Sequence, residues 1–281
     1  MKAEIENGNA LSVSQPRLSA TASWAEIYEQ VKKFPYNGLI DIRFDEETQF
    51  VVLCMNDDVI SLRYLWTDGT FTEPESLDCW KALAKKSAFT IDVGAYTGFY
   101  SLIAASLNRN PVYAYEPISF IHARLATNAM LNNFANLKFE NKAVSNKSET
   151  IRIALRFGPR LFSSGSSITE EALERAAAAL AVDAITLDSQ HANDPVELIK
   201  IDVESAEMMV LEGAKDILSA KKPVLMMETG KGTHADVVSF LEKMGYSCHP
   251  IEASGGAFNY LFYCEDSKLY PEVASIIAGR D

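Results

Sequence analysis

The sequence predicts an α/β fold: a doubly wound, mostly parallel sheet with an antiparallel last strand, preceded by an N-terminal helix and hairpin extension. Two observations carry this prediction. From residue 88 onward, short apolar runs alternate with segments of helical periodicity, which is typical of parallel strands joined by crossover helices. The last two apolar runs are separated only by the Gly-rich stretch 252–259. This stretch is too short for a crossover helix, so the final strand should run antiparallel.

Three regions are expected along the chain. Residues 1–22 are polar and rich in Ser, Ala and Asn, so we expect a flexible tail. Residues 23–86 form an extension, and residues 87–281 carry the alternating strand and helix pattern of the main domain. Within the extension we expect a helix at 24–34, a hairpin of strands 50–55 and 59–64, and a short helix at 77–86.

Periodicity places the elements of the main domain. The expected strands are 89–93, 112–115, 137–141, 151–155, 198–201, 224–227, 247–251 and 260–264. The expected helices are 99–108, 118–131, 170–180, 207–219 and 235–244, and the alanine run at 176–179 is interpreted as the interior of a helix.

Composition and net charge disfavour several classes of function and localisation. The formal net charge of −12 disfavours binding to nucleic acid or to anionic membranes, because both carry negative charge. The N-terminus lacks the apolar core of a secretory signal, and no stretch approaches the about 18 apolar residues that a membrane helix needs. The four cysteines form no C-x-x-C pair, so no zinc or redox motif is indicated. We therefore expect a cytoplasmic protein acting on a small molecule or glycan, with a homo-oligomer left open.

The segment from Phe89 to Phe99 indicates a ligand site. It reads as a strand, a tight turn with two glycines, and the start of a helix. Ligands of open α/β sheets bind beyond the carboxyl ends of the strands, where a helix N-terminus offers free N–H groups. The candidate cofactor-binding residues here are Asp92, Gly94, Ala95, Tyr96, Thr97 and Gly98. Their spacing matches neither the dinucleotide nor the P-loop glycine pattern.

Carboxylates end two further predicted strands. Glu116, followed by Pro117, ends the second strand of the main domain, where a carboxylate accepts hydrogen bonds from both hydroxyls of a ribose. Asp202 and Glu204 follow a strand that should neighbour the first one, so their side chains should face the reaction site.

Several motifs together resemble one family. The motifs are Asp92-Val93-Gly94-Ala95-Tyr96-Thr97-Gly98, Tyr115-Glu116-Pro117, Asn141-Lys142-Ala143-Val144-Ser145, Ile199-Lys200-Ile201-Asp202-Val203-Glu204, Leu211-Glu212-Gly213-Ala214 and Met227-Glu228. Over residues 89–265 the chain resembles the FkbM-type S-adenosylmethionine-dependent methyltransferases, which are class I, Rossmann-like enzymes. One departure is Ser205, where the family usually has glycine.

The resemblance implies S-adenosyl-L-methionine as cofactor and O-methylation of a sugar or polyketide hydroxyl. It implies that Asp92, Gly94 and Gly98 line the methionine end and that Glu116 holds the ribose. It also implies that Lys142 and Ala143 lie near the adenine, and that Asp202 and Glu204 face the methyl group.

Removing the proton of an alcohol calls for a positioned base. The candidates are Asp202, Glu204, Glu228 and His234, which follows a loop-like Gly-rich stretch. A divalent metal held by the three carboxylates is chemically reasonable, and the sequence leaves that question open.

One segment interrupts the regular alternation. The stretch 156–169 combines Arg156 and Arg160 with aromatic, glycine and serine residues, and we expect it to form an acceptor-binding loop. Two other classes remain, a nicotinamide-dependent oxidoreductase and a non-catalytic nucleoside-binding protein. The first needs a pyrophosphate-binding glycine pattern, and the second has no need of the acids near the reaction centre.

Overall fold

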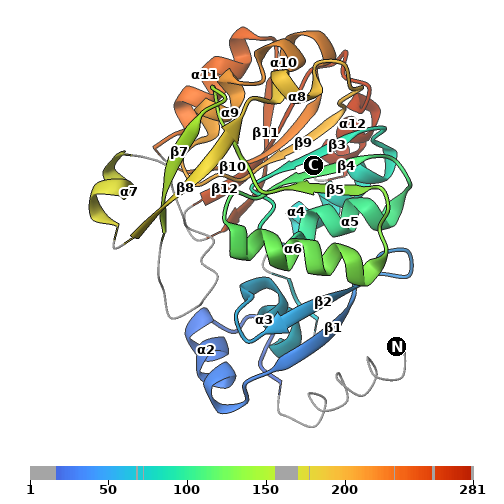
Figure 1. Cartoon of the computed structure of the whole chain (residues 1–281). Coiled ribbons are helices and arrows are strands. Elements are labelled where there is room, and N and C mark those ends of the chain that lie inside the picture. The colour runs from blue at the N-terminus through green and yellow to red at the C-terminus, as the bar shows by residue number, and fades with distance from the viewer. Residues whose placement is uncertain are drawn as a thin grey trace.

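A seven-stranded sheet forms the centre of the computed structural model, which describes residues 17–67, 69–71, 73–155, 170–176, 178–230, 232–254 and 257–279. The strand order is β11-β12-β10-β9-β3-β4-β5 (Figure 1). The bounds are β3 Thr90–Val93, β4 Val112–Tyr115, β5 Leu137–Glu140, β9 Leu198–Ile201, β10 Val224–Gly230, β11 Ser247–Ser254 and β12 Ala257–Tyr263.

Strand β3 lies inside the sheet, between β4 and β9, and pairs in parallel with both. Strands β5 and β10 extend the parallel arrangement on either side. Strand β12 runs antiparallel to both β10 and β11, which confirms the expected antiparallel last strand. The predicted doubly wound α/β fold is therefore confirmed, and the carboxyl ends of the parallel strands share one edge of the sheet.

Helices cover both faces of this sheet (Figure 1). One face carries α4 (Pro74–Lys86), α5 (Phe99–Leu107), α6 (Ser119–Asn132) and α12 (Tyr270–Ala278); the other carries α8 (Leu187–His191), α9 (Glu207–Glu212), α10 (Lys215–Lys221) and α11 (His234–Lys243). Because successive strand residues point to opposite faces, Leu198 packs with the first layer and Ile199 with the second. Lys200 lies two residues after Leu198 on the same strand, so its side chain points to the same face of the sheet, toward α5.

The extension differs from the predicted hairpin. Strand β2 (Gln49–Met55) pairs with β1 (Asn37–Arg43), and the predicted partner 59–64 lies in helix α3 (Val59–Trp66). The reason is helix capping: the Asp58 carboxylate accepts hydrogen bonds from the amides of Ile60 and Ser61, both at 2.9 Å. The prediction took a helix start for a hairpin turn.

The start of the described chain packs against α3. The amide of Leu18 donates to the Trp66 carbonyl at 2.8 Å, Arg17 donates to the Leu65 carbonyl, and Ala22 is buried. Helix α2 (Trp24–Lys33) follows as expected. Residues 17–22 of the predicted flexible tail 1–22 thus contact α3, and residues 1–16 lie outside the described part of the chain.

Side chains of α6 join the extension to the main domain. Asn132 accepts from the Val51 amide and donates to the Val51 carbonyl, both at 2.7 Å, and Asn128 accepts from the Leu53 amide at 2.8 Å. Asn128 also donates to the carbonyl of Thr97 in the glycine-containing turn, at 2.9 Å. The free edge of β2 is thereby paired with side chains, and the extension is tied to the turn that follows β3.

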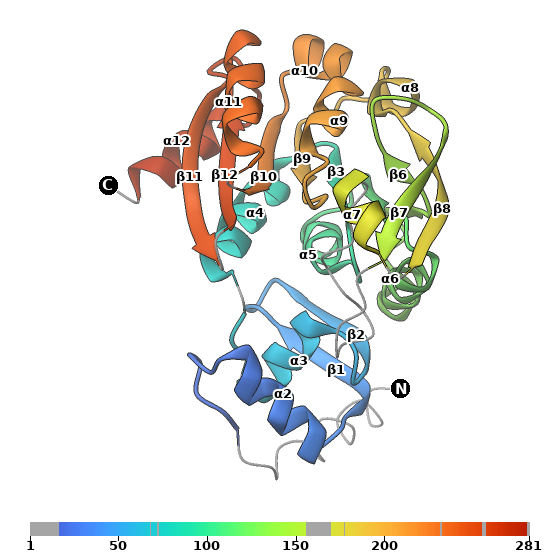
Figure 2. The same ribbon diagram turned by 90° about the vertical axis from the view of Figure 1, so that its left-hand side faces the viewer.

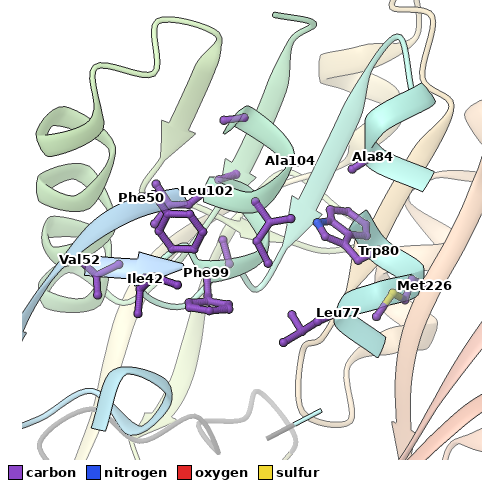
Figure 3. Close-up of a cluster of buried hydrophobic side chains, with 14 of the residues drawn as sticks. Ile42, Phe50, Val52, Leu77, Trp80, Ala84, Phe99, Leu102, Ala104 and Met226 are labelled. Carbon is purple, nitrogen blue, oxygen red and sulfur yellow. The ribbon is translucent and has the colours of Figure 1, made fainter. Parts of the chain in front are cut away.

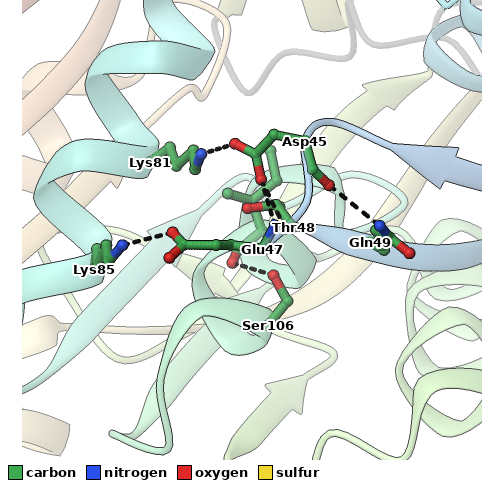
Figure 4. Close-up of polar contacts among 8 residues, drawn as sticks. Asp45, Glu47, Thr48, Gln49, Lys81, Lys85 and Ser106 are labelled. Atoms are coloured by element: carbon green, nitrogen blue, oxygen red, sulfur yellow. Dashed lines mark hydrogen bonds and ion pairs between the residues drawn. The ribbon is translucent and has the colours of Figure 1, made fainter.

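An apolar cluster strengthens this joint. Figure 3 shows Phe50 and Val52 of the hairpin beside Phe99 and Leu102 of α5, with Trp80 of α4 close by. The rings of Phe50 and Phe99 meet edge to face at 5.3 Å. Within the extension, ion pairs join Asp45 and Glu47, in the turn of the hairpin, to Lys81 and Lys85 of α4 (Figure 4). Figure 2 shows the extension in blue as a layer below the main domain.

A smaller sheet of β6 (Ala143–Val144), β7 (Thr150–Leu155) and β8 (Ala178–Ile185) lies beside β5. The expected helix 170–180 is wrong in its second half: α7 ends at Arg175, and the alanine run continues into β8. Strand β8 pairs antiparallel with β7 from Ala178 to Asp183, so pairing between strands overrides the helix propensity of alanine.

The expected helix 207–219 is two helices, α9 and α10, separated by Gly213 and Ala214. A Cβ atom on Gly213 would lie 2.0 Å from the carbonyl oxygen of Ser145. The break therefore brings the backbone of the α9–α10 connection against the segment after β6, an approach that only glycine permits.

Candidate active site

The turn after β3 packs directly on the end of β9. Gly94 has φ +80° and Gly98 has φ +93°, and Tyr96 between them also has a positive φ of 52°. A Cβ on Gly94 would lie 1.9 Å from the Asp202 carbonyl oxygen. Glycine is required at position 94 by the neighbouring backbone itself, so any larger residue there would push the ends of β3 and β9 apart.

Glu116 is held rigidly at the end of β4. Its carboxylate accepts from the amide of Tyr96 at 3.0 Å and from that of Ile118 at 2.8 Å, and the residue is only 5% exposed. Burial raises the pKa of Glu116 to about 8, while the two amides oppose that shift. This carboxyl group is desolvated and pre-oriented, as a ligand-binding group should be.

A cavity of about 100 Å³ lies beside Glu116. It brings together most of the residues predicted for the cofactor: Gly94, Tyr96, Glu116, Pro117, Lys142, Ala143 and Asp202. Apolar side chains complete its walls, among them Ile121 and Ile153. Lys142 also forms an ion pair with Glu140 at 2.7 Å. We call this the first cavity.

A second cavity of about 230 Å³ shares Gly94, Tyr96, Asp202 and Glu204 with the first, so the two lie side by side at the ends of β3 and β9. Its remaining lining residues in the main domain are Asp92, Ala95, Phe99, Tyr100, Lys200 and Glu228. The extension contributes Trp24, Val59, Ile60, Phe71, Glu73 and Leu77. Three of the four predicted bases therefore meet in this second cavity.

Two predicted cofactor residues line neither cavity. Thr97 is buried, and its carbonyl accepts the bond from Asn128. Gly98 caps the start of α5, where a Cβ would lie 3.1 Å from the Leu125 side chain. Both residues therefore contribute to the conformation of the turn and not to the surface of either cavity.

Asp92 is completely buried below the turn. Its Oδ2 accepts a hydrogen bond from the Ser101 hydroxyl at 2.6 Å, whereas Oδ1 has no partner among the described residues. Burial raises the pKa of Asp92, and the positive charge of Lys200 opposes the shift. A buried carboxyl oxygen without a partner, in a residue that lines a cavity, is suited to receive a donor from a bound molecule.

Lys200 is the cation of the site and was missed as a functional residue. Its ammonium lies 2.8 Å from Asp202 and 4.4 Å from the ring centre of Tyr100. Burial by itself would lower the pKa of Lys200, but the charges of Asp202 and Asp92 outweigh burial and raise it. The signal in the sequence was a lysine inside an otherwise apolar buried strand, a position where charge is rare unless paired.

Two glutamates that line the second cavity, Glu228 and Glu73, have raised pKa values. Repulsion by Asp202, followed by burial, raises the pKa of Glu228 to about 8, with a further contribution from Glu73. Burial and then Asp202 raise the pKa of Glu73, whose Oε2 accepts from the Tyr100 hydroxyl at 3.1 Å. Glu73 was not predicted from the sequence, because it immediately precedes α4 in the extension and no motif marks it.

The loop after β9 has an unusual backbone. Glu204 has φ +50° and Ser205 has φ +75°, both in the left-handed region that favours glycine. The Ser205 amide donates to the Glu207 carboxylate at 2.8 Å, which helps to hold this conformation. The departure from glycine at position 205 therefore costs backbone strain and keeps the loop geometry.

His234 is not brought into the site. Its Nδ1 lies 3.0 Å from the Thr229 hydroxyl, and its ring stacks on Tyr260 with centroids 4.2 Å apart. It lines neither of the two cavities. Arg156 and Arg160 lie outside the described residues. In the described part of the chain, no group of three or more His, Cys, Asp or Glu has an arrangement that could hold a metal ion.

No helix in the described ranges is both long and apolar enough to span a membrane.

Several solved structures of methyltransferases are similar to this chain. The chain is similar to the FkbM methyltransferase of Methylobacillus flagellatus KT, with 15% identity and a TM-score of 0.46 over 73% of this chain and 55% of that chain. It thus spans little more than half of the length of that relative. It is also similar to a SAM-dependent methyltransferase from Agrobacterium tumefaciens, with 11% identity and a TM-score of 0.45 over 82% and 70% of the two chains.

A third similar structure is M. jannaschii TYW2 in complex with AdoMet, with 11% identity and a TM-score of 0.42 over 82% of this chain and 86% of that chain. The search of curated proteins found no match. The family model of the methyltransferase FkbM domain matches residues 92–248, which is more than half of the chain. The protein therefore belongs to the FkbM family of S-adenosylmethionine-dependent methyltransferases.

Proposed function

We propose that this protein transfers a methyl group from S-adenosylmethionine to a hydroxyl oxygen of a small-molecule or glycan acceptor, such as a sugar or polyketide. The observation that carries the proposal is the pair of cavities joined at Gly94, Tyr96, Asp202 and Glu204. One cavity presents a buried, pre-oriented carboxyl group and the other presents several carboxylates. Two adjoining cavities are what a reaction between a donor and an acceptor requires.

The residues of the first cavity fit the donor. Glu116 offers a fixed carboxyl group for the ribose hydroxyls, and Lys142 and Ala143 lie where the adenine would be read. The unpartnered Oδ1 of Asp92 offers a further acceptor toward the methionine end. Asp202 and Glu204, shared by both cavities, place negative charge where a sulfonium cation would lie.

When bound, S-adenosylmethionine supplies a methyl group on a positively charged sulfur, already activated for displacement. The protein must then orient the acceptor oxygen and remove its proton. Glu228 is the best-placed base of those predicted, because its raised pKa makes it the stronger proton acceptor. Asp202 is less suited to this role, because its carboxylate is already engaged in an ion pair with the Lys200 ammonium at 2.8 Å.

The net charge of −12 supports acceptors other than nucleic acids and membrane lipids. Binding of the acceptor by Arg156 and Arg160 stays a prediction, as does a homo-oligomeric state.

Isothermal titration with S-adenosylhomocysteine and, separately, with NAD tests the donor. We expect binding of the first and none of the second. Transfer of labelled methyl groups to a panel of hydroxylated sugars, polyketides and glycans tests the acceptor. Binding of NAD alone would replace the proposal with the oxidoreductase alternative, and labelling of nitrogen rather than oxygen would overturn O-methylation.

A further inference from the structure

The wall that the extension contributes to the second cavity is almost wholly apolar. Trp24, Val59, Ile60, Phe71 and Leu77 line it from three helices and a connecting segment. Of the described residues that this wall presents, Glu73 is the polar one. An acceptor lying between this wall and the carboxylates of the main domain therefore meets apolar surface on one side, interrupted by a single carboxyl group.

Glu73 is oriented by the main domain. The hydroxyl of Tyr100, on α5, donates to its Oε2 at 3.1 Å, and the ring of Tyr100 contacts the Lys200 ammonium. The side chain of Asn259 makes a second hydrogen bond to this carboxylate. Because a carboxylate has about four lone-pair sites, these two bonds still leave capacity for a donor from a ligand. A fixed hydrogen-bonding group in an apolar wall is the usual means by which a pocket selects one orientation of a ligand.

The charges of the second cavity disfavour an anion. Glu73, Asp202, Glu204 and Glu228 all line it, and Lys200 is already paired with Asp202. A phosphate or carboxylate on the acceptor would face these acids without a free partner among the described lining residues. A molecule with polar groups on every side would place hydroxyl groups against the apolar wall, where they would have no hydrogen-bond partner. Burying hydroxyl groups without partners costs free energy.

We propose that the acceptor is an uncharged molecule with an apolar body and at least two hydroxyl groups, of which one is methylated and another is bound by Glu73. This inference rests on the proposed function, since it takes the second cavity as the acceptor site. It makes Glu73 a specificity-determining residue that lies outside the part of the chain matched by the family model.

Binding of matched probes to the full chain saturated with S-adenosylhomocysteine tests this proposal. The probes are phenylethylene glycol, with an apolar body and two hydroxyls; phenylethanol, with one; methyl glucoside, polar all round; and phenyl phosphate, an anion. We expect phenylethylene glycol to bind about tenfold more tightly than each of the others, the usual effect of one well-placed hydrogen bond. Saturation-transfer NMR measures the four affinities.

The variants Glu73→Leu and Glu73→Gln test the residue. Glu73→Leu should weaken binding of phenylethylene glycol about tenfold and leave phenylethanol unchanged, and Glu73→Gln should show a smaller loss because an amide oxygen still accepts. Glu75→Gln, at an exposed position of α4, is the matched control and should bind like the wild type. Affinity for S-adenosylhomocysteine should stay constant in all variants and reports that each is folded; if Glu73→Leu does not fold, Glu73→Gln decides.

Three results would overturn the inference: tighter binding of methyl glucoside or phenyl phosphate, no binding of any probe, or equal affinity of the wild type and the Glu73 variants for phenylethylene glycol. Each leaves the proposed function standing if S-adenosylhomocysteine binds. Failure of S-adenosylhomocysteine to bind the wild type would instead overturn the proposed function.

Discussion

At the scale of single residues, charge in the main domain gathers where the two cavities adjoin. Asp92, Asp202 and Glu228 lie on or directly after neighbouring strands, and Lys200 is the cation placed among them. Burial raises the pKa of Asp92, and repulsion by Asp202 followed by burial raises the pKa of Glu228, while the charge of Lys200 offsets only part of these shifts. The site is therefore poised to bind a positive group, which agrees with a sulfonium donor.

Glu116 offers a direct test of the donor site. Glu116→Ala should weaken binding of S-adenosylhomocysteine by about 1–3 kcal/mol, because charge-assisted hydrogen bonds to the ribose are lost. The amides of Tyr96 and Ile118 also lose their acceptor. Isothermal titration measures the effect. Glu116→Gln, which keeps an acceptor oxygen, should lose less, and unchanged affinity in the alanine variant would remove Glu116 from the donor site.

Glu228 should make the stability of the protein depend on pH. Its pKa in the folded state is about 8, above the ordinary value of 4.5, mainly because Asp202 repels its charged form. Its stabilising contribution is therefore complete below about pH 4.5 and is lost as the pH rises through about 8. The Glu228→Gln side chain carries no charge at any pH. Between pH 4.5 and pH 8 the free energy of unfolding of this variant should therefore fall less than that of the wild type, by on the order of 2 kcal/mol.

Urea unfolding at several pH values between these limits, for the wild type and for Glu228→Gln, measures the difference. Glu242→Gln, at an exposed position of α11, is the control for removing one negative charge from an acidic protein and should follow the wild type. Parallel pH profiles of the wild type and Glu228→Gln would show that Glu228 is not under this repulsion.

At the scale of elements, the contact of α6 with β2 depends on a match between helix and strand geometry. Asn128 and Asn132 are four residues apart, which is about 6 Å along a helix. Val51 and Leu53 are two residues apart, which is about 6.6 Å along a strand. The two asparagines therefore reach alternate backbone positions of β2 and cover part of an edge that would otherwise be free to pair with another chain.

Asn132→Ala should destabilise the protein by about 1–3 kcal/mol, because the partly buried amide and carbonyl of Val51 lose their partner. Thermal or urea unfolding measures this loss. Thr127→Ala removes an exposed hydrogen bond to the Ala123 carbonyl within the same helix and should change stability by less than about 0.5 kcal/mol. Equal stability of the two variants would mean that water replaces the asparagine at the strand edge.

At the scale of the whole molecule, the extension and the main domain together line the second cavity, which is the proposed acceptor site. The apolar cluster of Figure 3 and the contacts of α6 hold the two parts together. A further link is buried: Arg124 of α6 binds both carboxylate oxygens of Asp57 at 2.9 Å and also donates to the Leu53 carbonyl. Trp24 and Glu73 lie in the site only while this assembly holds.

Breaking the Arg124–Asp57 pair on one side should cost about 3–5 kcal/mol of unfolding free energy, because an uncompensated charge stays buried. Arg124→Met and Asp57→Leu made together should cost less than the sum of the two single changes. Urea unfolding of the four proteins measures this coupling. Strict additivity would show that solvent reaches the unpaired charge.

Much of the main domain follows from patterns that act over short distances. The alternation of apolar runs predicted the parallel strands, and the short connection before β12 predicted its direction. The motifs around Gly94, Glu116 and Asp202 predicted the residues that line the first cavity. These predictions succeeded because hydrophobic periodicity and the residue types that favour turns can be recognised within short stretches of the sequence.

The errors arose where distant segments decide local structure. Residues 59–64 form a helix because Asp58 caps it, and the alanines from Ala178 form a strand because β7 pairs with them. Such outcomes depend on which surfaces meet, and local propensity does not contain that information.

The sequence by itself determined the α/β architecture, the family and the glycine-containing turn after β3, because each depends on residues close together along the chain. Only the tertiary structure decided which residues line the second cavity. Glu73 and Trp24 come from the extension, and they reach Lys200, Asp202 and Glu228 because buried polar and apolar contacts hold the extension against α5 and α6. Burial and charge repulsion among residues far apart in the chain then set the pKa values of that site, and both exist only once the chain has folded.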